Sequence, residues 1–323
     1  MTPTVGQVLS GVDLTGKICV ITGATSGLGL MTAQGLASAG ATVVLAGRDP
    51  ERLRAAAEAI TTETATAAVE TVELELDSQA SVRSAAVEIS GTFPRVDVLI
   101  NNAGVMFTPY QRTKDGFELQ LGVNHLGHFE LTRRLLPLLL NAGSARVINL
   151  SSDGHKIFDI DLDDPNWEQG LYDKFKAYGA AKTANVLFTV ALDARYRDSD
   201  IRSFAVHPGT VATSLSRYMS KGDMKAMMGL GSADRDPAAA APRLEVIPVE
   251  QGAATSVWAA VSDDLAGLGG LYLADCAVSA NVAPYAVDPQ RAEQLWTISE
   301  RLCGSTVSRP SAQVVRSSGD GAG

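Results

Sequence analysis

Tyr178 and Lys182 stand four positions apart in AYGAAKTANVLF, residues 177–188, a stretch with strong helical character. A spacing of four brings two side chains to the same face of a helix, so the phenol and the ammonium can be neighbours. Two titratable groups side by side are a candidate for acid–base chemistry. They can also be two polar residues on a solvated face, which is the ordinary situation in an amphipathic helix.

A second candidate site is the glycine cluster TGATSGLG, with Gly23, Gly27 and Gly29 between a predicted strand and a predicted helix. Glycines let the backbone approach a pyrophosphate closely, and a helix N-terminus offers free N–H groups and a positive dipole to the anion. The alternative is an ordinary glycine-rich turn. The position at the start of a βαβ unit favours a dinucleotide-binding loop.

The end of the next predicted strand, VVLAGRDPERL, bears on the type of dinucleotide. Gly47 stands where a binder of unphosphorylated dinucleotide usually carries an acid, and Arg48 follows it. This favours NADP(H) over NAD(H), with Arg48 pairing the 2′-phosphate, although Arg48 can also be a solvated charge at a helix start. Asp77, after the third strand, is placed to bond the adenine amino group or, alternatively, to cap the following helix.

Short apolar strands and helical stretches alternate along the chain and must position these residues. Because the strands are nearly continuous Val/Ile/Leu runs, they predict a parallel sheet covered by helices on both faces, and hence an α/β, doubly wound Rossmann fold with a single domain. Pro137, late in a long helical stretch that reaches Leu140, predicts a kink or an early end there. Strands are expected at 17–22, 41–46, 70–76, 96–101, 145–151, 201–207 and 270–274, and helices at 28–39, 51–60, 78–90, 173–195, 250–261 and 288–302.

Composition limits the class of protein. The chain has 323 residues, of which 46% are hydrophobic, and a net charge of −9. This acidic balance argues against nucleic acid as a partner. Cys19, Cys276 and Cys303 have no CxxC spacing, which fits neither a zinc site nor a disulfide framework.

The chain shows neither a signal sequence nor an apolar run of membrane-spanning length, so we expect a cytoplasmic protein without a membrane anchor. The domain is expected to cover residues 1–304. Four of the seven methionines fall within an insertion at about 214–248, which predicts either a mobile apolar lid over a ligand or a poorly ordered surface segment. Residues 305–323 are predicted to be a disordered tail.

Four further motifs follow in order: NNAG at 101–104, GVNHLGHF around Asn124, VINLSS ending at Ser152, and HPGTVAT at 207–213. With them the sequence resembles the short-chain dehydrogenase/reductase family over nearly all of residues 16–304. Within this family, NHLGHFELT, YGAAKTANVLF and AEQLWTISERL resemble the branch of retinol dehydrogenases and WW-domain-containing oxidoreductases.

This resemblance implies a catalytic tetrad of Asn124, Ser152, Tyr178 and Lys182. Tyr178 would be the general acid in reduction and the general base in oxidation, with Lys182 lowering its pKa toward working pH and holding the nicotinamide ribose. Ser152 would hydrogen-bond the substrate oxygen, and Asn124 would anchor a water chain that returns protons to Lys182.

The cofactor contacts expected from the glycine cluster, the strand ends and the resemblance together are Gly23, Thr25, Ser26, Gly27, Leu28, Gly29, Arg48, Leu76, Asp77, Asn102, Ala103, Gly104, Tyr178, Lys182, Pro208, Gly209, Val211 and Thr213. The four histidines, His125, His128, His155 and His207, have no metal-ligand spacing and are interpreted as structural or solvated.

We therefore expect an NADP(H)-dependent oxidoreductase that acts on the carbonyl or alcohol of a fairly large apolar small molecule, as a possible homodimer or homotetramer. One alternative is a C=C reductase of the same superfamily, as protochlorophyllide reductases are, although Ala184 stands where that group carries a cysteine. The other is a catalytically silent NADP(H)-binding regulatory protein, which typically lacks part of the tetrad.

Overall fold

The computed structural model describes residues 2–64, 68–212 and 246–304, together with Leu215, Met219, Gly222 and Asp223. Within them, a largely parallel eight-stranded sheet forms the centre, in the order β10-β9-β6-β5-β4-β1-β2-β3, with β10 antiparallel to β9. A short parallel pair, β7 and β8, lies apart from it. The strands are β1 Ile18–Thr22, β2 Thr42–Gly47, β3 Val69–Glu73, β4 Val98–Asn101, β5 Ala145–Leu150, β6 Ile201–His207, β7 Thr210–Val211, β8 Val246–Ile247, β9 Leu271–Ala274 and β10 Ala277–Val278.

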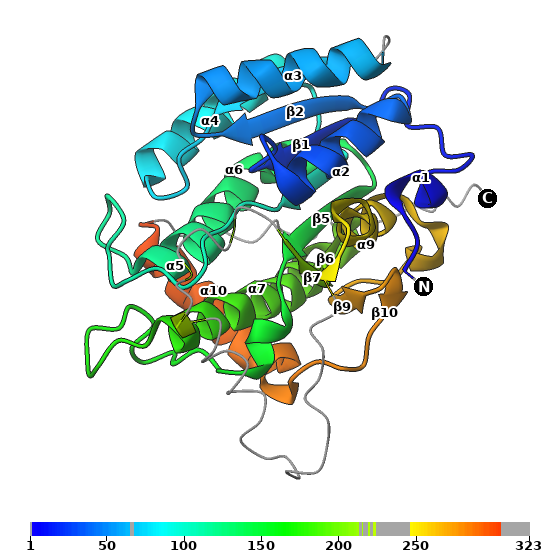
Figure 1. The fold of residues 1–323 in the computed structure, drawn as a ribbon. Coiled ribbons are helices and arrows are strands. Elements are labelled where there is room, and N and C mark those ends of the chain that lie inside the picture. The colour runs from blue at the N-terminus through cyan, green and yellow to red at the C-terminus, as the bar shows by residue number, and fades with distance from the viewer. Residues whose placement is uncertain are drawn as a thin grey trace, which may run out of the picture.

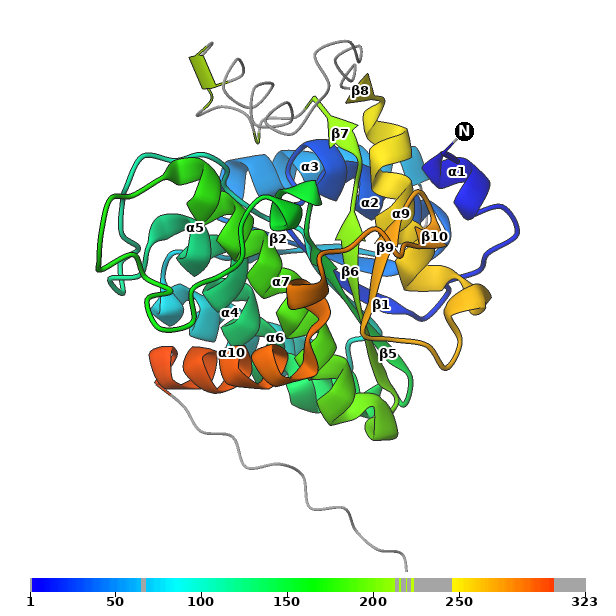
Figure 2. The same ribbon diagram turned by 90° about the horizontal axis from the view of Figure 1, so that it is seen from below.

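Helices cover both faces of the sheet because successive strand residues point to opposite sides. Cys19 and Ile21 of β1 pack into one core, and Ile18 and Val20 pack into the other. Figure 1 shows α3 (Pro50–Thr64) lying over β2, and Figure 2 shows α10 (Pro289–Leu302) against the long helix α7 (Lys174–Tyr196). The first core involves α1 Val5–Val8, α2 Gly27–Ser38, α3 Pro50–Thr64 and α9 Val249–Val261, and the second involves α4 Gln79–Thr92, α6 Gly127–Asn141, α7 Lys174–Tyr196 and α10 Pro289–Leu302.

The strand order places a topological switch between β1 and β4. From β1 the chain proceeds to β2 and β3 on one side, and from β4 to β5 and β6 on the other. In open α/β sheets, ligands bind at the carboxyl ends of the strands beside such a switch. The glycine cluster follows β1 and the NNAG motif lies at the end of β4, so the fold brings these two motifs together.

The doubly wound fold is confirmed, but several local predictions need correction. Helix α6 continues past Pro137 to Asn141, so it does not end early. The long helical stretch includes a one-residue-wider π-helical turn, η1 (Gly122–Leu126), after the short helix α5 (Leu119–Leu121). Strand β3 is not an apolar run buried on both faces, because it forms the sheet edge and most of its residues are exposed.

The described part of the chain contains no helix that is both long enough and apolar enough to span a bilayer.

Candidate active site

Tyr178 and Lys182 lie on a buried face of α7. The Asp173 side chain caps this helix by accepting hydrogen bonds from the N–H groups of Phe175 (2.8 Å) and Lys176 (3.1 Å), which fixes where the helix begins. The Nζ of Lys182 lies 5.6 Å from the centre of the Tyr178 ring. Their side chains are only 4% and 5% exposed, so the interpretation of a solvated helix face is wrong.

The ammonium of Lys182 is held by the end of β5. Its Nζ donates to the Leu150 carbonyl at 3.0 Å, and the Asn185 side chain donates to the same oxygen at 2.9 Å. The Ser151 hydroxyl donates to the main-chain carbonyl of Lys182 at 3.0 Å. Burial lowers the pKa of Lys182 to about 8, so this amine titrates close to neutral pH.

Ser152 lies directly after β5 and contacts Tyr178. The Gly154 N–H donates to Ser152 Oγ at 2.8 Å, which leaves the serine hydroxyl hydrogen free to point toward the phenol. The Ser152 hydroxyl lies beside the phenol and works to lower the pKa of Tyr178. Serine 152, rather than its neighbour Ser151, is therefore the one that faces the phenol.

Burial dominates the ionisation of Tyr178. It raises the pKa of the phenol to about 12, and the Ser152 hydroxyl only partly opposes this. The expected lowering of the Tyr178 pKa by Lys182 is therefore not seen in the protein alone. The physical reason is that the free-energy cost of removing the phenolate from water exceeds the stabilisation that the Ser152 hydroxyl provides.

Asn124 lies in the π-helical turn and is fully buried. Its side chain pairs with both main-chain groups of Val105, accepting from the N–H at 2.8 Å and donating to the carbonyl at 2.9 Å. The side chain is thus occupied in holding the loop after β4. The main-chain carbonyl of Asn124 is the group that could anchor a water, and His128 Nδ1 lies 3.0 Å from it.

A cavity of about 410 Å³ opens at the carboxyl ends of β1, β2 and β4. Its lining includes twelve of the predicted cofactor contacts, which the structure therefore brings together: Gly23, Thr25, Ser26, Gly27, Leu28, Gly29, Arg48, Leu76, Asp77, Asn102, Ala103 and Gly104. Gly104 links this cavity to the tetrad, because a Cβ added there would lie 3.0 Å from the side-chain oxygen of Asn124.

The glycine loop is packed too tightly for side chains. Gly23 has φ +67°, and a Cβ at Gly29 would lie 2.5 Å from the Gly23 carbonyl oxygen. The Asn102 side chain donates to the Thr22 carbonyl at 2.8 Å and ties this loop to β4. Ser26, the N-cap of α2, makes no side-chain cap, so the first N–H groups of that helix face the cavity without an internal acceptor.

Arg48 is an exposed residue at the cavity rim and has no hydrogen bond or ion pair with the described part of the chain. Arg52, in the first turn of α3, also lines the cavity and was missed. Its position two residues into the helix that follows Arg48 was the signal that could have found it. Gln111 and Arg112 were missed as well, because their segment has no periodic pattern.

Asp77 lines the cavity, but it does not cap α4. Ser78 is the cap and accepts from the Ser81 N–H at 3.3 Å, so the alternative interpretation of Asp77 is wrong.

The predicted contacts after β6 lie next to the cavity lining and not within it. Pro208, Gly209 and Val211 are not part of the cavity lining. Pro208 and Val211 pack instead beside Gly252 of α9, where an added Cβ would lie 2.4 Å from Val211 Cγ2 and 2.9 Å from Leu28 Cδ2. Thr213, most of the 214–248 insertion and the 305–323 tail lie outside the described residues.

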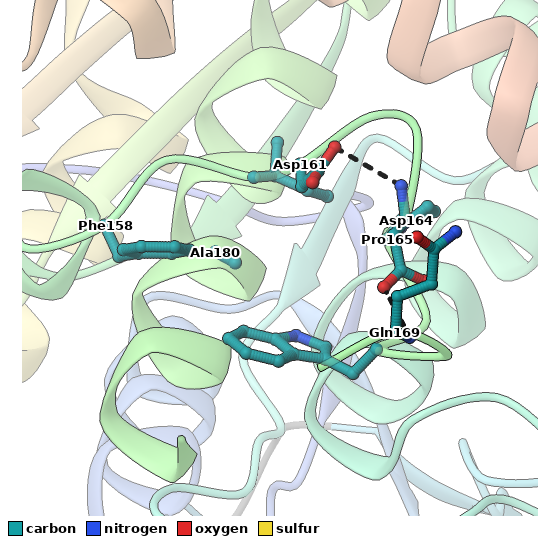
Figure 3. Close-up of a pocket in the computed structure, with 8 residues that line it drawn as sticks. Phe158, Asp161, Asp164, Pro165, Gln169 and Ala180 are labelled. Atoms are coloured by element: carbon teal, nitrogen blue, oxygen red, sulfur yellow. Dashed lines mark hydrogen bonds between the residues drawn. The ribbon is translucent and has the colours of Figure 1, made fainter. Parts of the chain in front are cut away.

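A smaller cavity of about 100 Å³ lies in the segment between Ser152 and Tyr178 (Figure 3). Its carboxylates are occupied by the backbone: Asp161 accepts from the Asp164 N–H at 3.3 Å, and Asp164 accepts from the Gln169 N–H at 2.9 Å. Ala180 lines it, two positions after Tyr178 and therefore about 200° around α7 from it. This cavity faces away from the tetrad.

The histidines are structural, but three of them are not solvated. His125, His128 and His155 are buried, and burial lowers the pKa of each. Among the described residues, no group of three or more potential ligands is arranged to hold a metal ion.

Comparisons with known proteins agree with this fold. The short chain dehydrogenase family matches residues 17–159. Human retinol dehydrogenase 13 is 40% identical over 93% of this chain and 88% of its own length. The chain therefore belongs to the short-chain dehydrogenase family of oxidoreductases.

Other relatives extend the same picture. Human retinol dehydrogenase 12 is 40% identical over 93% of this chain and 90% of its own length. An uncharacterised protein from Mycobacterium paratuberculosis superposes with a TM-score of 0.72 at 34% identity, covering 96% of this chain and 100% of that one. The RhlG–NADP complex of Pseudomonas aeruginosa superposes with a TM-score of 0.61 at 25% identity, covering 81% and 95%.

Proposed function

We propose that this protein is an NADP(H)-dependent oxidoreductase that interconverts a carbonyl and an alcohol, with Tyr178 as the group that gives or takes the proton. One observation carries the proposal. A buried phenol lies beside Ser152 and shares a helix face with Lys182, next to a cavity of dinucleotide-binding type.

The proposed chemistry uses the ionisation states of these groups. In the reducing direction, the carbonyl oxygen of the substrate accepts a proton from the Tyr178 hydroxyl while it is held by Ser152. With a pKa of about 12, Tyr178 is protonated at neutral pH and ready to donate. Lys182, with a pKa of about 8, is suited to return a proton to the phenolate.

The residues around the larger cavity fit NADP(H). The free N–H groups at the start of α2 and the side-chain-free glycine loop suit a pyrophosphate, and Arg48 and Arg52 suit a 2′-phosphate. When bound, the cofactor supplies or accepts the hydride. Gly47, which carries no carboxylate, leaves the 2′ position without a repelling charge.

An aromatic wall beside Tyr178 supports a fairly large apolar substrate. Phe107 packs edge-on to the Tyr178 ring, with ring centres 5.1 Å apart, and its ring centre lies 4.7 Å from that of Phe175. Phe107 has φ +55°, an unfavourable conformation for a bulky residue, and its N–H is held by Gln120 at 2.8 Å. The retinol dehydrogenase names of the relatives agree with an apolar alcohol or aldehyde.

The first test is Tyr178→Phe, assayed by NADPH consumption with a panel of apolar aldehydes and ketones. Loss of the proton donor should lower kcat by about 10²–10⁴-fold, with the NADPH Kd unchanged. Tyr110→Phe, at an exposed tyrosine, is the matched control and should keep wild-type turnover. Undiminished turnover by Tyr178→Phe refutes the role of this phenol.

The second test concerns cofactor choice. Arg48→Ser and Arg52→Ser should each raise KM for NADPH by about tenfold, with KM for NADH unchanged, since a hydrogen bond to a charged group contributes about 1.5–3 kcal/mol. Arg54→Ser is the matched control, because Arg54 lies on the same helix but pairs with Glu58 at 3.0 Å. Equal losses for both cofactors contradict the 2′-phosphate assignment.

The cytoplasmic location and assembly into a dimer or tetramer stay predictions.

A further inference from the structure

His128 occupies the junction between the cofactor cavity and the tetrad. It is the second residue of α6 and only 2% exposed. Its Nε2 lies 2.8 Å from the hydroxyl of Thr22, the last residue of β1. Its Nδ1 lies 3.0 Å from the main-chain carbonyl of Asn124, one turn earlier in the same helical run. Both ring nitrogens are thus engaged.

The partners of His128 determine which nitrogen carries the hydrogen. A carbonyl oxygen only accepts, so Nδ1–H donates to Asn124. Burial lowers the pKa of His128 to about 4, and the charge of Lys182 works in the same direction, so the ring is neutral. Nε2 is then an acceptor, and the Thr22 hydroxyl donates to it.

Thr22 extends this connection to the cofactor cavity. Its Oγ1 accepts the N–H groups of Asn102 at 2.9 Å and Ala103 at 3.0 Å, two residues of the cavity lining. Because the hydroxyl hydrogen is directed to His128, the oxygen lone pairs face these two N–H groups. The imidazole therefore orients the hydroxyl that holds the loop after β4.

The other ring nitrogen of His128, Nδ1, hydrogen-bonds the main-chain carbonyl of Asn124. The Asn124 side chain pairs with Val105, and the main-chain carbonyl is the group that could hold a proton-carrying water. The imidazole N–H occupies one of the two lone pairs of this carbonyl and fixes its direction.

We propose that His128 is a positioning residue with two separable roles: it orients Thr22 to hold the cofactor-binding loop, and it orients the Asn124 carbonyl for proton return to Lys182. The second role rests on the proposed function, whereas the first concerns cofactor binding alone.

Two variants separate the roles, because the asparagine amide can replace Nδ1 and the glutamine amide can replace Nε2. His128→Asn keeps the bond to Asn124 and loses that to Thr22, so the NADPH Kd should rise by about tenfold with kcat preserved. His128→Gln keeps the bond to Thr22 and loses that to Asn124, so kcat should fall by about tenfold with the Kd preserved. These sizes follow from the cost of an unmade buried hydrogen bond.

The Kd is measured by NADPH fluorescence titration without turnover, and kcat at saturating substrate and cofactor. His125→Asn is the matched control, because His125 is also buried but bonds Ser299 at 2.7 Å in the core between α6 and α10. It should lower Tm and change neither the Kd nor kcat.

A crosswise result, with Kd altered only in His128→Asn and kcat only in His128→Gln, supports the proposal. A parallel change of Kd and kcat in both variants, or no change in either, overturns it. If neither variant folds, Thr22→Val should raise the Kd whereas Thr22→Ser should not, and equal Kd values overturn the first role. Tyr178→Phe distinguishes the failure of one proposal from the failure of the other. Full turnover by Tyr178→Phe refutes the proposed function. If Tyr178→Phe is inactive but the two His128 variants change Kd and kcat in parallel, only the inference about His128 is refuted.

Discussion

Gly154 is a position where one methyl group should disrupt catalysis without touching the cofactor cavity. A Cβ at residue 154 would lie 2.8 Å from Ser152 Oγ and 2.9 Å from Cε1 of Tyr178. Because ordinary van der Waals contact begins near 3.4 Å, Gly154→Ala must displace the hydroxyl, the ring or both by about half an ångström. Gly154 itself does not have a positive φ, so backbone strain contributes nothing to this effect.

A misplacement of this size should lower kcat by about 10- to 100-fold, since reacting groups must be held in near-attack geometry. Overpacking should also reduce the free energy of unfolding by about 1–3 kcal/mol. The NADPH Kd should stay unchanged, because Gly154 does not line the larger cavity.

The assay combines steady-state kinetics, NADPH titration and urea unfolding. Gly91→Ala is the control, since a Cβ at this helical position meets nothing within 4 Å and should add about 0.5–1 kcal/mol of stability without altering kcat. Wild-type kcat in a folded Gly154→Ala variant would refute the requirement for the observed Ser152–Tyr178 arrangement.

Three further predictions concern stability and binding. Burial alone would raise the pKa of Asp97, but hydrogen bonds from the Ile18 N–H, Lys17 and Arg95 outweigh it and leave the pKa below its usual value. The stabilisation by Asp97 is therefore present above the unfolded-state pKa and is lost as pH falls through the folded-state pKa. In urea unfolding at neutral pH, Asp97→Asn should lower the free energy of unfolding by about 1–3 kcal/mol. In strong acid the variant and the wild type should have equal stability. Trp296→Ala should lower the free energy of unfolding by about 3–5 kcal/mol in the same assay, because the buried indole packs in the core between α7 and α10. Gly29→Ala should raise the NADPH Kd by about tenfold or more in a fluorescence titration, because the glycine loop must open to admit the methyl group. An unchanged Kd would mean that this loop does not contact the cofactor.

Local patterns were sufficient for most of the fold. The helix predicted over 173–195 is observed as Lys174–Tyr196, and the strand predicted over 201–207 is observed with those bounds. Both have strong periodicity or a buried run, together with clear boundaries, such as Asp173 as an N-cap. The π-helical turn around Asn124 had no comparable signal, because a residue pattern with helical spacing does not show which carbonyl loses its usual partner.

The same distinction between local and tertiary signals applies to the residues that line the larger cavity. The glycine cluster and Arg48 were found because each stands directly after a strand, and parallel strands end at one edge of the sheet. Arg112 also lines the cavity, but it belongs to an irregular segment whose path is determined by tertiary contacts, including its ion pair with Glu168 at 3.1 Å. Such contacts join residues far apart in sequence and leave no periodic pattern to detect.

For the Tyr178–Lys182 pair, the local sequence predicts the shared helix face but not the pKa values. That the two side chains share a face follows from the spacing of four, which is a property of any helix. Their ionisation depends on parts of the chain that are distant in sequence: the burial of both side chains and, for the phenol, the Ser152 hydroxyl. Burial disfavours the charged form of each, so it raises the pKa of Tyr178 to about 12 and lowers that of Lys182 to about 8. In the protein alone, the phenol therefore keeps its proton at neutral pH, and Lys182 has the lower pKa of the two groups.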